Sequence, residues 1–547
     1  MTSRSVRPRY LLVVVMVLLV VLGGCVDSGS GSGSESPDGE ARGQDEIEAE
    51  REVAKSEGRG DGEDPAAADL DDASAPESPP VEVCGNDEIL GNGPAAPPDG
   101  SVEVPAGDNS SVDFSRPGTT YWFAPGVHTL GSGTYASIEP GSGSRFVGAP
   151  GAVLDGGKVN RYAFTGHGSD VVVEYLTIQN FGAVGENNNE GVVNHNSARG
   201  WTVRYNTIRH NAGAGLMIGS GSVVRFNCLT RNGQYGFNAY SPTGPVDVTL
   251  DHNELSHNNT YDWESRIEGC GCTGGGKFWA VRNAVVTNNY VHDNKGVGLW
   301  ADNNNRGFLI ALNYIADNDE VGLMYETSYN ALIRFNTIVG NGHVGGPRNP
   351  GFPTGGIYVS ESGADSRVET RYGEALEISG NLLRDNWSGI VLWENADRYC
   401  GSPANTSTGE CTLVNPRAVT ERTCNADNIR EEPYYTDCRW KTQNVQIHDN
   451  VFEHSPSRIG QRCTFDNACG VMAIMSNYGT YPDWSPYTAR TVQEAVTYEQ
   501  GNVFRDNTYR GSWRFMPFEQ NRLVRFEEWR DAPYEQDAGS TFETGSE

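Results

Sequence analysis

Positive charge is scarce in this sequence, and long apolar runs are almost missing from it. The 547 residues include 41 lysines and arginines against 71 aspartates and glutamates, which gives a formal charge of −30. An excess of acid this large repels nucleic acid and anionic bilayers, so we expect no nucleic-acid partner. The one long apolar run lies near the N-terminus and is too short to cross a bilayer comfortably. The remaining sequence predicts no transmembrane helix.

Residues 1–24 have the pattern of a secretory signal peptide. A basic start with Arg4, Arg7 and Arg9 precedes the apolar run, which ends in LGGC. That string resembles the bacterial lipobox, and the resemblance implies cleavage before Cys25 and diacylation of its thiol. An ordinary signal peptide that happens to end near a cysteine is the alternative. The Gly/Ser-rich stretch that follows suits a tether, so we expect an extracytoplasmic lipoprotein that is anchored to the membrane through Cys25.

Aromatic residues are missing from residues 26–83. This segment has 18 acidic and 4 basic residues, and such a composition offers too little apolar surface to fold. We therefore expect residues 25–83 to be a lipidated, disordered linker. Residues 84–547 should form one domain, which we expect to be a monomer.

The cysteines favour disulfides over a metal site. Their number, eleven, is odd, and lipidation of Cys25 would leave ten to pair. Zinc is the competing interpretation, but the sequence offers no CxxC pair and no spaced histidine partner. We expect a disulfide-bearing insertion over residues 395–440. Cys228 is expected to face outward, where it could pair with Cys270 or Cys272 of a long loop.

An asparagine recurs through the chain with apolar residues at fixed offsets. A large apolar residue follows two positions later and, in the first eight copies, another lies three positions earlier. The recurring asparagines are Asn206, Asn227, Asn253, Asn289, Asn313, Asn336, Asn381, Asn450 and Asn502. A second asparagine often comes five positions later, and a Gly-apolar step such as GLWA or GLMY then opens the next unit.

Short β-branched runs broken by Asn and Gly predict strands joined by tight bends. One repeat would form one coil, and coils must stack because none can bury its own apolar row. In such a stack, each bend asparagine could bond the asparagines of neighbouring coils. The pattern resembles the PbH1-type repeat of right-handed parallel β-helix proteins in the pectate-lyase-like superfamily. The resemblance implies an all-β solenoid, but not one activity, because the superfamily includes lyases, hydrolases, epimerases and proteins with no known reaction.

Aligning the coils on the Gly-apolar step predicts which side chains leave the solenoid. The residues expected to face inward are Leu299, Ala301, Leu323, Tyr325, Ile357, Val359, Ile390 and Leu392. One outward row should contain Trp300, Met324, Tyr358 and Val391. The row beside it should contain Asp302, Glu326, Ser360 and Trp393. Glu361 and Glu394 follow one position further on, at the turn.

Asp302 and Glu326 should therefore be stacked neighbours, about 5 Å apart in adjacent coils. That separation resembles the carboxyl pair of retaining glycosidases, with one group as the acid and one as the nucleophile. Asp302 with Glu361 would be a wider pair, suited to inversion. Glu361 and Glu394 are the expected supporting carboxylates. A solvated acidic row without function is the simplest alternative, and Ca²⁺ bridging the acids is another.

Aromatic and basic residues surround the predicted acids. Trp300, Tyr358 and Trp393 offer flat faces on which a sugar ring could lie. A β-elimination lyase would instead need a Lys or Arg base. Lys277, in CGCTGGGKFWAVRN, is the candidate base, with Arg266 close in sequence as a substrate-binding residue. A solvated lysine is the commoner outcome.

The histidines divide into two groups. His210, His257 and His292 should lie at bends, whereas His195 falls in the row of Asp302. From these patterns we expect a surface-anchored protein that binds and cleaves a polysaccharide, with hydrolysis favoured and elimination as a variant. A non-catalytic glycan-binding or structural surface lipoprotein is the alternative from another class.

Overall fold

The computed structural model describes most of the chain from residue 73 onward. The described residues are 70, 73–185, 191–193, 199–241, 243–267, 271, 274–368, 375–395, 419–420, 422–425, 427–428, 431–438, 440–476, 491–517 and 522–543. The predicted lipid anchor at Cys25 lies outside these ranges and stays a prediction, as does the expectation for His195; Cys270 and Cys272 also lie outside these ranges. Among the described residues, no helix is both long and apolar enough to span a bilayer.

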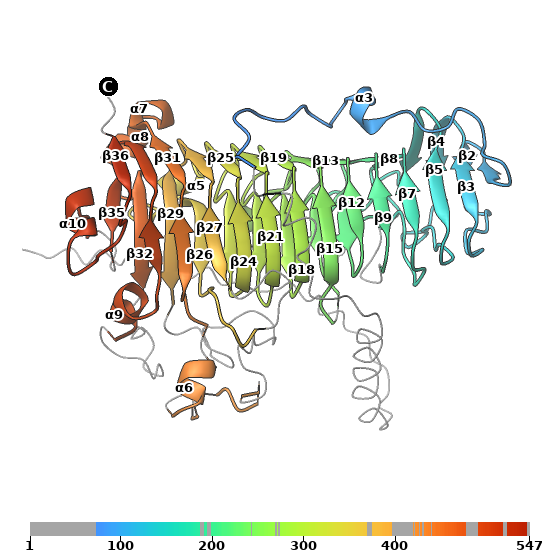
Figure 1. The fold of residues 1–547 in the computed structure, drawn as a ribbon. Coiled ribbons are helices and arrows are strands. Elements are labelled where there is room, and N and C mark those ends of the chain that lie inside the picture. The colour runs from blue at the N-terminus through green and yellow to red at the C-terminus, as the bar shows by residue number, and fades with distance from the viewer. Residues whose placement is uncertain are drawn as a thin grey trace, which may run out of the picture.

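Three parallel sheets, named A, B and C here, wind along one axis (Figure 1). Sheet A contains β1 (Val102–Val104), β3 (Thr120–Phe123), β5 (Arg145–Gly148), β7 (Val172–Glu174), β9 (Thr202–Arg204), β12 (Val223–Arg225), β15 (Val246–Asp251), β18 (Arg282–Thr287), β21 (Arg306–Ala311), β24 (Tyr329–Arg334), β27 (Leu376–Ser379), β30 (Val445–His448) and β33 (Val503–Arg505). Sheet B contains β2 (Gly107–Asp108), β4 (Gly126–Thr129), β6 (Ala152–Asp155), β8 (Thr177–Gln179), β10 (Thr207–Arg209), β13 (Cys228–Thr230), β16 (Glu254–Ser256), β19 (Tyr290–His292), β22 (Tyr314–Ala316), β25 (Thr337–Val339), β28 (Leu382–Arg384), β31 (Val451–His454), β34 (Thr508–Gly511) and β36 (Thr541–Glu543).

Sheet C carries the outward rows predicted from the sequence. It contains β11 (Leu216–Ile218), β14 (Phe237–Ala239), β17 (Gly276–Trp279), β20 (Leu299–Asp302), β23 (Leu323–Glu326), β26 (Gly355–Ser360), β29 (Ser388–Glu394), β32 (Val471–Ser476) and β35 (Arg514–Met516). The residues expected to face inward all lie in the main apolar core. The predicted parallel β-helix is therefore confirmed.

Short helices lie outside the three sheets. They are α3 (Asp87–Leu90), α4 (Trp263–Arg266), α5 (Gly345–Arg348), α6 (Tyr434–Asp437), α7 (Pro456–Ile459), α8 (Gln461–Phe465), α9 (Thr491–Tyr498) and α10 (Phe526–Arg530). Of these, α4, α5, α7 and α8 fall in connections that lead from a strand of sheet B to a strand of sheet C. These connections add side chains beside sheet C without interrupting the stack.

A continuous ladder of buried asparagines occupies the bend between sheets A and B. In each step, one side-chain amide donates to the carbonyl oxygen of the next asparagine; Asn289 donates to Asn313, and Asn313 to Asn336, at 3.0 and 2.9 Å. The amide of Asn313 also donates to Val286 O at 2.8 Å. A second ladder, from Asn211 to Asn386, occupies the bend between sheets B and C. The buried asparagines of neighbouring coils thus form hydrogen bonds with one another, as the repeat predicted.

The last predicted copy of the repeat is wrong by five residues. Asn450 donates to Asn507, not to Asn502, at 3.1 Å. Phe504 and Tyr509, at the offsets of −3 and +2 from Asn507, lie in the core. The apolar offsets therefore identify the ladder residue better than the asparagine alone does.

An N-terminal strap, residues 73–93, runs along the outside of sheet B (Figure 1). Cys84 forms a disulfide with Cys228 of β13, so the expected pairing of Cys228 with the CGC loop is wrong. Glu254 Oε2 accepts hydrogen bonds from the backbone amides of Val83 and Cys84, each at 2.8 Å. The outward orientation of Cys228 was predicted correctly, but its partner came from a segment that the repeat does not reach.

Two further disulfides, Cys424–Cys438 and Cys463–Cys469, confirm that paired cysteines are present. Of the predicted bend histidines, His210 and His257 do adopt the left-handed conformation of a bend, with φ of 55° and 54°. His292 instead ends β19 and is buried.

His292 lies between two carboxylates. Its Nε2 is 3.3 Å from Glu254 Oε1, and its Nδ1 is 2.7 Å from Asp293 Oδ2. Burial opposes the charged imidazolium, but the hydrogen bonds to these carboxylates outweigh burial and raise the pKa of His292. Burial also opposes the charge on Glu254, whose pKa is nevertheless lowered by its hydrogen bonds with His292 and the strap.

We predict that Asn313→Ala destabilises the protein strongly. The change removes the acceptor of both the backbone and side-chain amides of Asn289, and unsatisfied buried polar groups cost about 1–3 kcal/mol each. The free energy of unfolding in urea should fall by about 3 kcal/mol. Asn349→Ala, at an exposed position, is the matched control and should change it by less than about 0.5 kcal/mol. Equal losses in the two variants would contradict the role of the ladder.

We predict that His292→Gln lowers stability in a pH-dependent way. A group with a raised folded-state pKa contributes its full stabilisation below its unfolded pKa of ~6.5, and the contribution fades as the pH rises through the folded value. The wild type should exceed the variant most near about pH 5.5 and least near about pH 9. Urea unfolding at both values measures this margin, and a margin that does not change would argue against a charged His292.

Candidate functional site

The outer face of sheet C has the register that the sequence predicted. The first outward row runs through paired positions on adjacent strands, namely Lys277, Trp300, Met324, Tyr358 and Val391. In the second row Trp279 pairs with Asp302, and Glu326 continues the row through Ser360 and Trp393. Asp302 and Glu326 directly follow the paired residues Ala301 and Tyr325, so the two acids lie in neighbouring coils.

Lys277 and Asp302 form a buried ion pair. The distance from Nζ to Oδ2 is 2.8 Å, and the two side chains are only 8% and 1% exposed. The Lys277 ammonium also donates to Gly271 O at 3.1 Å. Tyr235 donates its hydroxyl proton to the same carbonyl. The alternative of a solvated Lys277 is therefore wrong, because the connection before β17 covers its side chain.

Trp300 joins this ion pair to Glu326. Lys277 Nζ lies 4.0 Å from the centroid of the Trp300 ring and 5.6 Å from that of Trp279. The indole Nε1 of Trp300 donates to Glu326 Oε2 at 3.1 Å. One face of the indole is thus occupied by the ammonium, a favourable contact with the ring quadrupole. Trp300 is 3% exposed, so its position fits a link between charged groups better than the predicted open sugar platform.

Aromatic side chains gather two coils further along the same face. The rings of Tyr358 and Trp393 are stacked, with centroids 6.4 Å apart and an interplanar angle of 29°. Phe352, from the connection before β26, lies 6.2 Å from Tyr358 and 6.1 Å from Trp393. Tyr358 is buried and Trp393 is half-buried. Phe352 lies outside the repeating strands, so the repeat carries no signal for its position.

Glu361 lies in the bend after β26 and Glu394 is the last residue of β29, so each lies one position beyond the row of Asp302. Glu361 has a φ of 44° and accepts hydrogen bonds from Ser360 Oγ and the amide of Asn395. Glu394 accepts from the amide of Thr442 at 2.9 Å. Both carboxylates are fully buried. The four acids thus form two pairs instead of one line, and these contacts fit a role for Glu361 and Glu394 in holding the bend.

Arg266 lies at the end of α4 and stacks on its own connection. Its guanidinium carbon is 5.3 Å from the ring centroid of Tyr261 and 5.4 Å from that of Trp263. Its side chain is exposed. The structure therefore brings Lys277, Asp302, Glu326 and Trp300 into one cluster, while Arg266 contacts a separate aromatic pair.

Glu320, a titratable acid in the connection before β23, was not predicted as a site residue. Burial raises the pKa of Glu320 to about 7, with the Arg348 charge opposing and the Asp319 charge adding to the shift. A carboxyl group with this pKa can hold a proton at neutral pH. An aspartate and a glutamate in sequence carry no signal for such burial, which depends on the packing of Glu320 against Gly345.

The Lys277 charge weakens the case for the alternative in which Ca²⁺ bridges the acids. A cation between Asp302 and Glu326 would balance their charge, but Lys277 already supplies one positive charge to Asp302. Within the described part of the chain, the sets of ligand atoms close enough to share an ion lie elsewhere, at His454 with Cys463 and Cys469 and at His257 with His292 and Asp293.

We predict that Lys277→Met destabilises the protein by about 3–5 kcal/mol, because it leaves the Asp302 carboxylate buried without a countercharge. The double variant Lys277→Met/Asp302→Asn should recover much of this loss, since it removes the stranded charge. Arg505→Met breaks an exposed pair with Asp506 and should cost less than about 1 kcal/mol. Urea unfolding measures all three variants. A double variant less stable than Lys277→Met would contradict the importance of the buried charge.

A family model agrees with the three-sheet solenoid. A family model described as "right handed beta helix region" matches residues 190–371, and a search of curated proteins finds no match. Among solved structures, the A-module of the Azotobacter vinelandii mannuronan C-5 epimerase AlgE6 is 14% identical and aligns over 65% of this chain and 83% of that chain, with a TM-score of 0.38. A mannuronic acid specific polysaccharide family 6 lyase from human gut microbiota is 13% identical over 85% of this chain and 90% of that chain, with a TM-score of 0.37. The family match and the three parallel sheets together show the fold of this chain, a right-handed parallel β-helix.

Proposed function

We propose that the protein is a carbohydrate-active enzyme that binds a glycan on the outer face of sheet C and hydrolyses a glycosidic bond there. The observation that carries this proposal is the buried Lys277–Asp302 ion pair with Glu326 in the next coil. Adjacent strands lie about 4.8 Å apart, close to the ~5–5.5 Å that separates the two carboxyl groups of retaining glycosidases.

The surroundings of the two acids differ, which suggests different roles. Asp302 pairs with Lys277, so we assign to it the role of the nucleophile that attacks the anomeric carbon. A second carboxylate beside an ionised one is disfavoured as an anion, so we assign the proton to Glu326. Glu326 would protonate the leaving oxygen and later take a proton from the attacking water. Trp300 holds the carboxyl group of Glu326 through Nε1.

The charge of the cluster favours an uncharged glycan over a polyuronate. Two carboxyl groups face one ammonium group, and the whole chain carries a formal charge of −30. The substrate carboxylates of a polyuronate would meet net repulsion here. Trp393 and Phe352 are half-buried, lie further along the same face and offer aromatic surface against which a sugar ring can pack.

Elimination is the second candidate, and the buried Lys277 is the observation that favours it. A lyase could use the Lys277 ammonium to neutralise a substrate carboxylate. However, Asp302 and the Trp300 ring both stabilise the charged ammonium, which opposes removal of its proton and hence a role as base. A glycan-binding protein without catalysis would use the same aromatic surface but would not depend on the protonation of Glu326.

The proposal predicts that Asp302→Asn and Glu326→Gln each lower hydrolysis by about 10²–10⁴-fold, the usual contribution of such a group. The protein would be incubated with a panel of neutral and anionic polysaccharides while reducing ends and the ultraviolet absorbance of unsaturated products are followed. Asp317 is an acid at the bend between sheets B and C. Its variant Asp317→Asn is the control and should retain activity. Far-ultraviolet circular dichroism verifies that each variant is folded.

Each outcome separates the candidate functions. The double displacement predicts new reducing ends without unsaturated products. Proton NMR should show that the product has the same anomeric configuration, α or β, as the substrate. Unsaturated products would replace hydrolysis with elimination. Full activity of folded Asp302→Asn and Glu326→Gln would overturn the assigned roles, and glycan binding without any cleavage across the panel would favour the non-catalytic alternative.

A further inference from the structure

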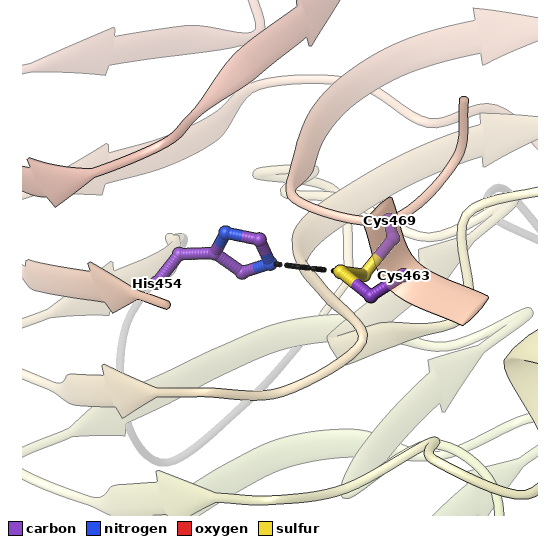
Figure 2. Close-up of side chains that lie close together, drawn as sticks. All are labelled: His454, Cys463 and Cys469. Carbon is purple, nitrogen blue, oxygen red and sulfur yellow. Dashed lines mark hydrogen bonds between the residues drawn. A yellow bond between two sulfur atoms is a disulfide. The ribbon is translucent and has the colours of Figure 1, made fainter. Parts of the chain in front are cut away.

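His454 points at a disulfide in the connection between β31 and β32, away from the acids of sheet C. Figure 2 shows the imidazole at the end of β31 with Nε2 directed toward the sulfurs of Cys463 and Cys469. Nε2 lies 3.7 Å from each of the two sulfur atoms. The loop closed by the disulfide is short, with a sequence separation of 6, and needs no imidazole to close it.

These distances approach the geometry of tetrahedral zinc. With Zn–S bonds of ~2.3 Å and a Zn–N bond of ~2.0–2.1 Å, the nitrogen and each sulfur lie about 3.6 Å apart, and the two sulfurs about 3.8 Å apart. The nitrogen is therefore already near its place relative to both sulfurs. Only the covalent bond between the two sulfurs would have to break so that they can move apart.

The surroundings keep the imidazole neutral, as a metal ligand must be. His454, Cys463 and Cys469 are each at most 4% exposed. Burial lowers the pKa of His454 to about 4, with the charge of Arg514 acting in the same direction. The ring of Trp513 lies 4.9 Å from the imidazole. The three side chains thus form a buried cluster with donor atoms of the types that zinc prefers.

We propose that His454, Cys463 and Cys469 form a redox-gated site for a thiophilic cation such as Zn²⁺. A dithiol reductant supplies two electrons and two protons, the Cys463–Cys469 bond breaks, and the reductant leaves as its own disulfide. The two thiols then lose their protons to solvent as two metal–sulfur bonds form. Nε2 of His454 donates its lone pair as the third ligand, and water takes the fourth position. A disulfide oxidant then takes two electrons from the sulfurs and two protons from solvent, leaves as its own dithiol, re-forms the Cys463–Cys469 bond and so releases the metal.

The spacing of these three residues in the sequence does not indicate a metal site. The CxxC spacing of common zinc motifs is absent, and His454 comes before both cysteines, nine residues from Cys463. The histidine reaches them because β31 ends at the start of their connection. This site is independent of the glycan proposal, since neither its residues nor its chemistry involve the Lys277 cluster.

Cobalt uptake by the whole protein tests the site. The protein is reduced with dithiothreitol, freed of it by anaerobic gel filtration, and titrated with Co²⁺, whose thiolate charge-transfer and tetrahedral visible bands report the ligands. Wild type should bind one Co²⁺ that Zn²⁺ displaces, and the oxidised protein should not. Cys463→Ser/Cys469→Ser should lose these bands, whereas the matched control Cys424→Ser/Cys438→Ser should keep them. His454→Gln should weaken Co²⁺ binding by at least about tenfold.

A second measurement does not depend on the folding of any variant. In the reduced wild type, Zn²⁺ should slow the alkylation of Cys463 and Cys469 by iodoacetamide at least about tenfold, as followed by peptide mass spectrometry. Unprotected cysteines, or cobalt bands that persist in Cys463→Ser/Cys469→Ser, would overturn the proposal and leave the pair as a structural disulfide. Co²⁺ affinity of folded His454→Gln equal to that of wild type would also overturn it.

Discussion

The stacking of buried asparagine amides is the constraint on which the rest of this structure depends. An amide inside the solenoid has no water to bond, so each ladder asparagine must meet the asparagine of the next coil. Asn289, Asn313 and Asn336 do so at 2.9 to 3.0 Å. Slipping a coil by one residue would break these bonds and would also turn its apolar side chains away from the core. The ladder therefore fixes register along the whole stack.

Fixed register is what places distant residues side by side on sheet C. Lys277, Asp302 and Glu326 come from three neighbouring strands of sheet C, namely β17, β20 and β23. The rest of one coil separates each of these strands from the next in the sequence. Because the backbone positions are determined by hydrogen bonds on the other sides of the coil, the outward side chains need not contribute to register. They are free to assemble a buried ion pair, whose desolvation is costly unless each charge finds a partner. Such a cost is more easily tolerated where the ladder already supplies stability.

The sequence predicted what repeats and missed what does not. The inward rows, the outward rows and the pairing of Asp302 with Glu326 follow from periodicity, since strand side chains alternate. The buried partners of Glu361, such as the amide of Asn395, depend on how the chain leaves the strand, which no period specifies. Cys84 reaches Cys228 through a strap outside the repeat. Periodicity also could not show that Lys277 would be covered, because the covering carbonyl of Gly271 belongs to a connection.

The length of the connections therefore determines where this β-helix can acquire chemistry. Most consecutive ladder asparagines from Asn206 to Asn336 are 21 to 26 residues apart, but Asn253 and Asn289 are 36 apart and Asn336 and Asn381 are 45 apart. The first long interval contains Gly271, which covers Lys277, and the second contains Phe352, which packs on Tyr358 and Trp393. The extra residues thus enter on both sides of the Asp302 and Glu326 coils. A regular stack supplies the rigid positions. The first insertion covers Lys277, so its ion pair with Asp302 is buried, and electrostatic interactions between charged groups are stronger away from water.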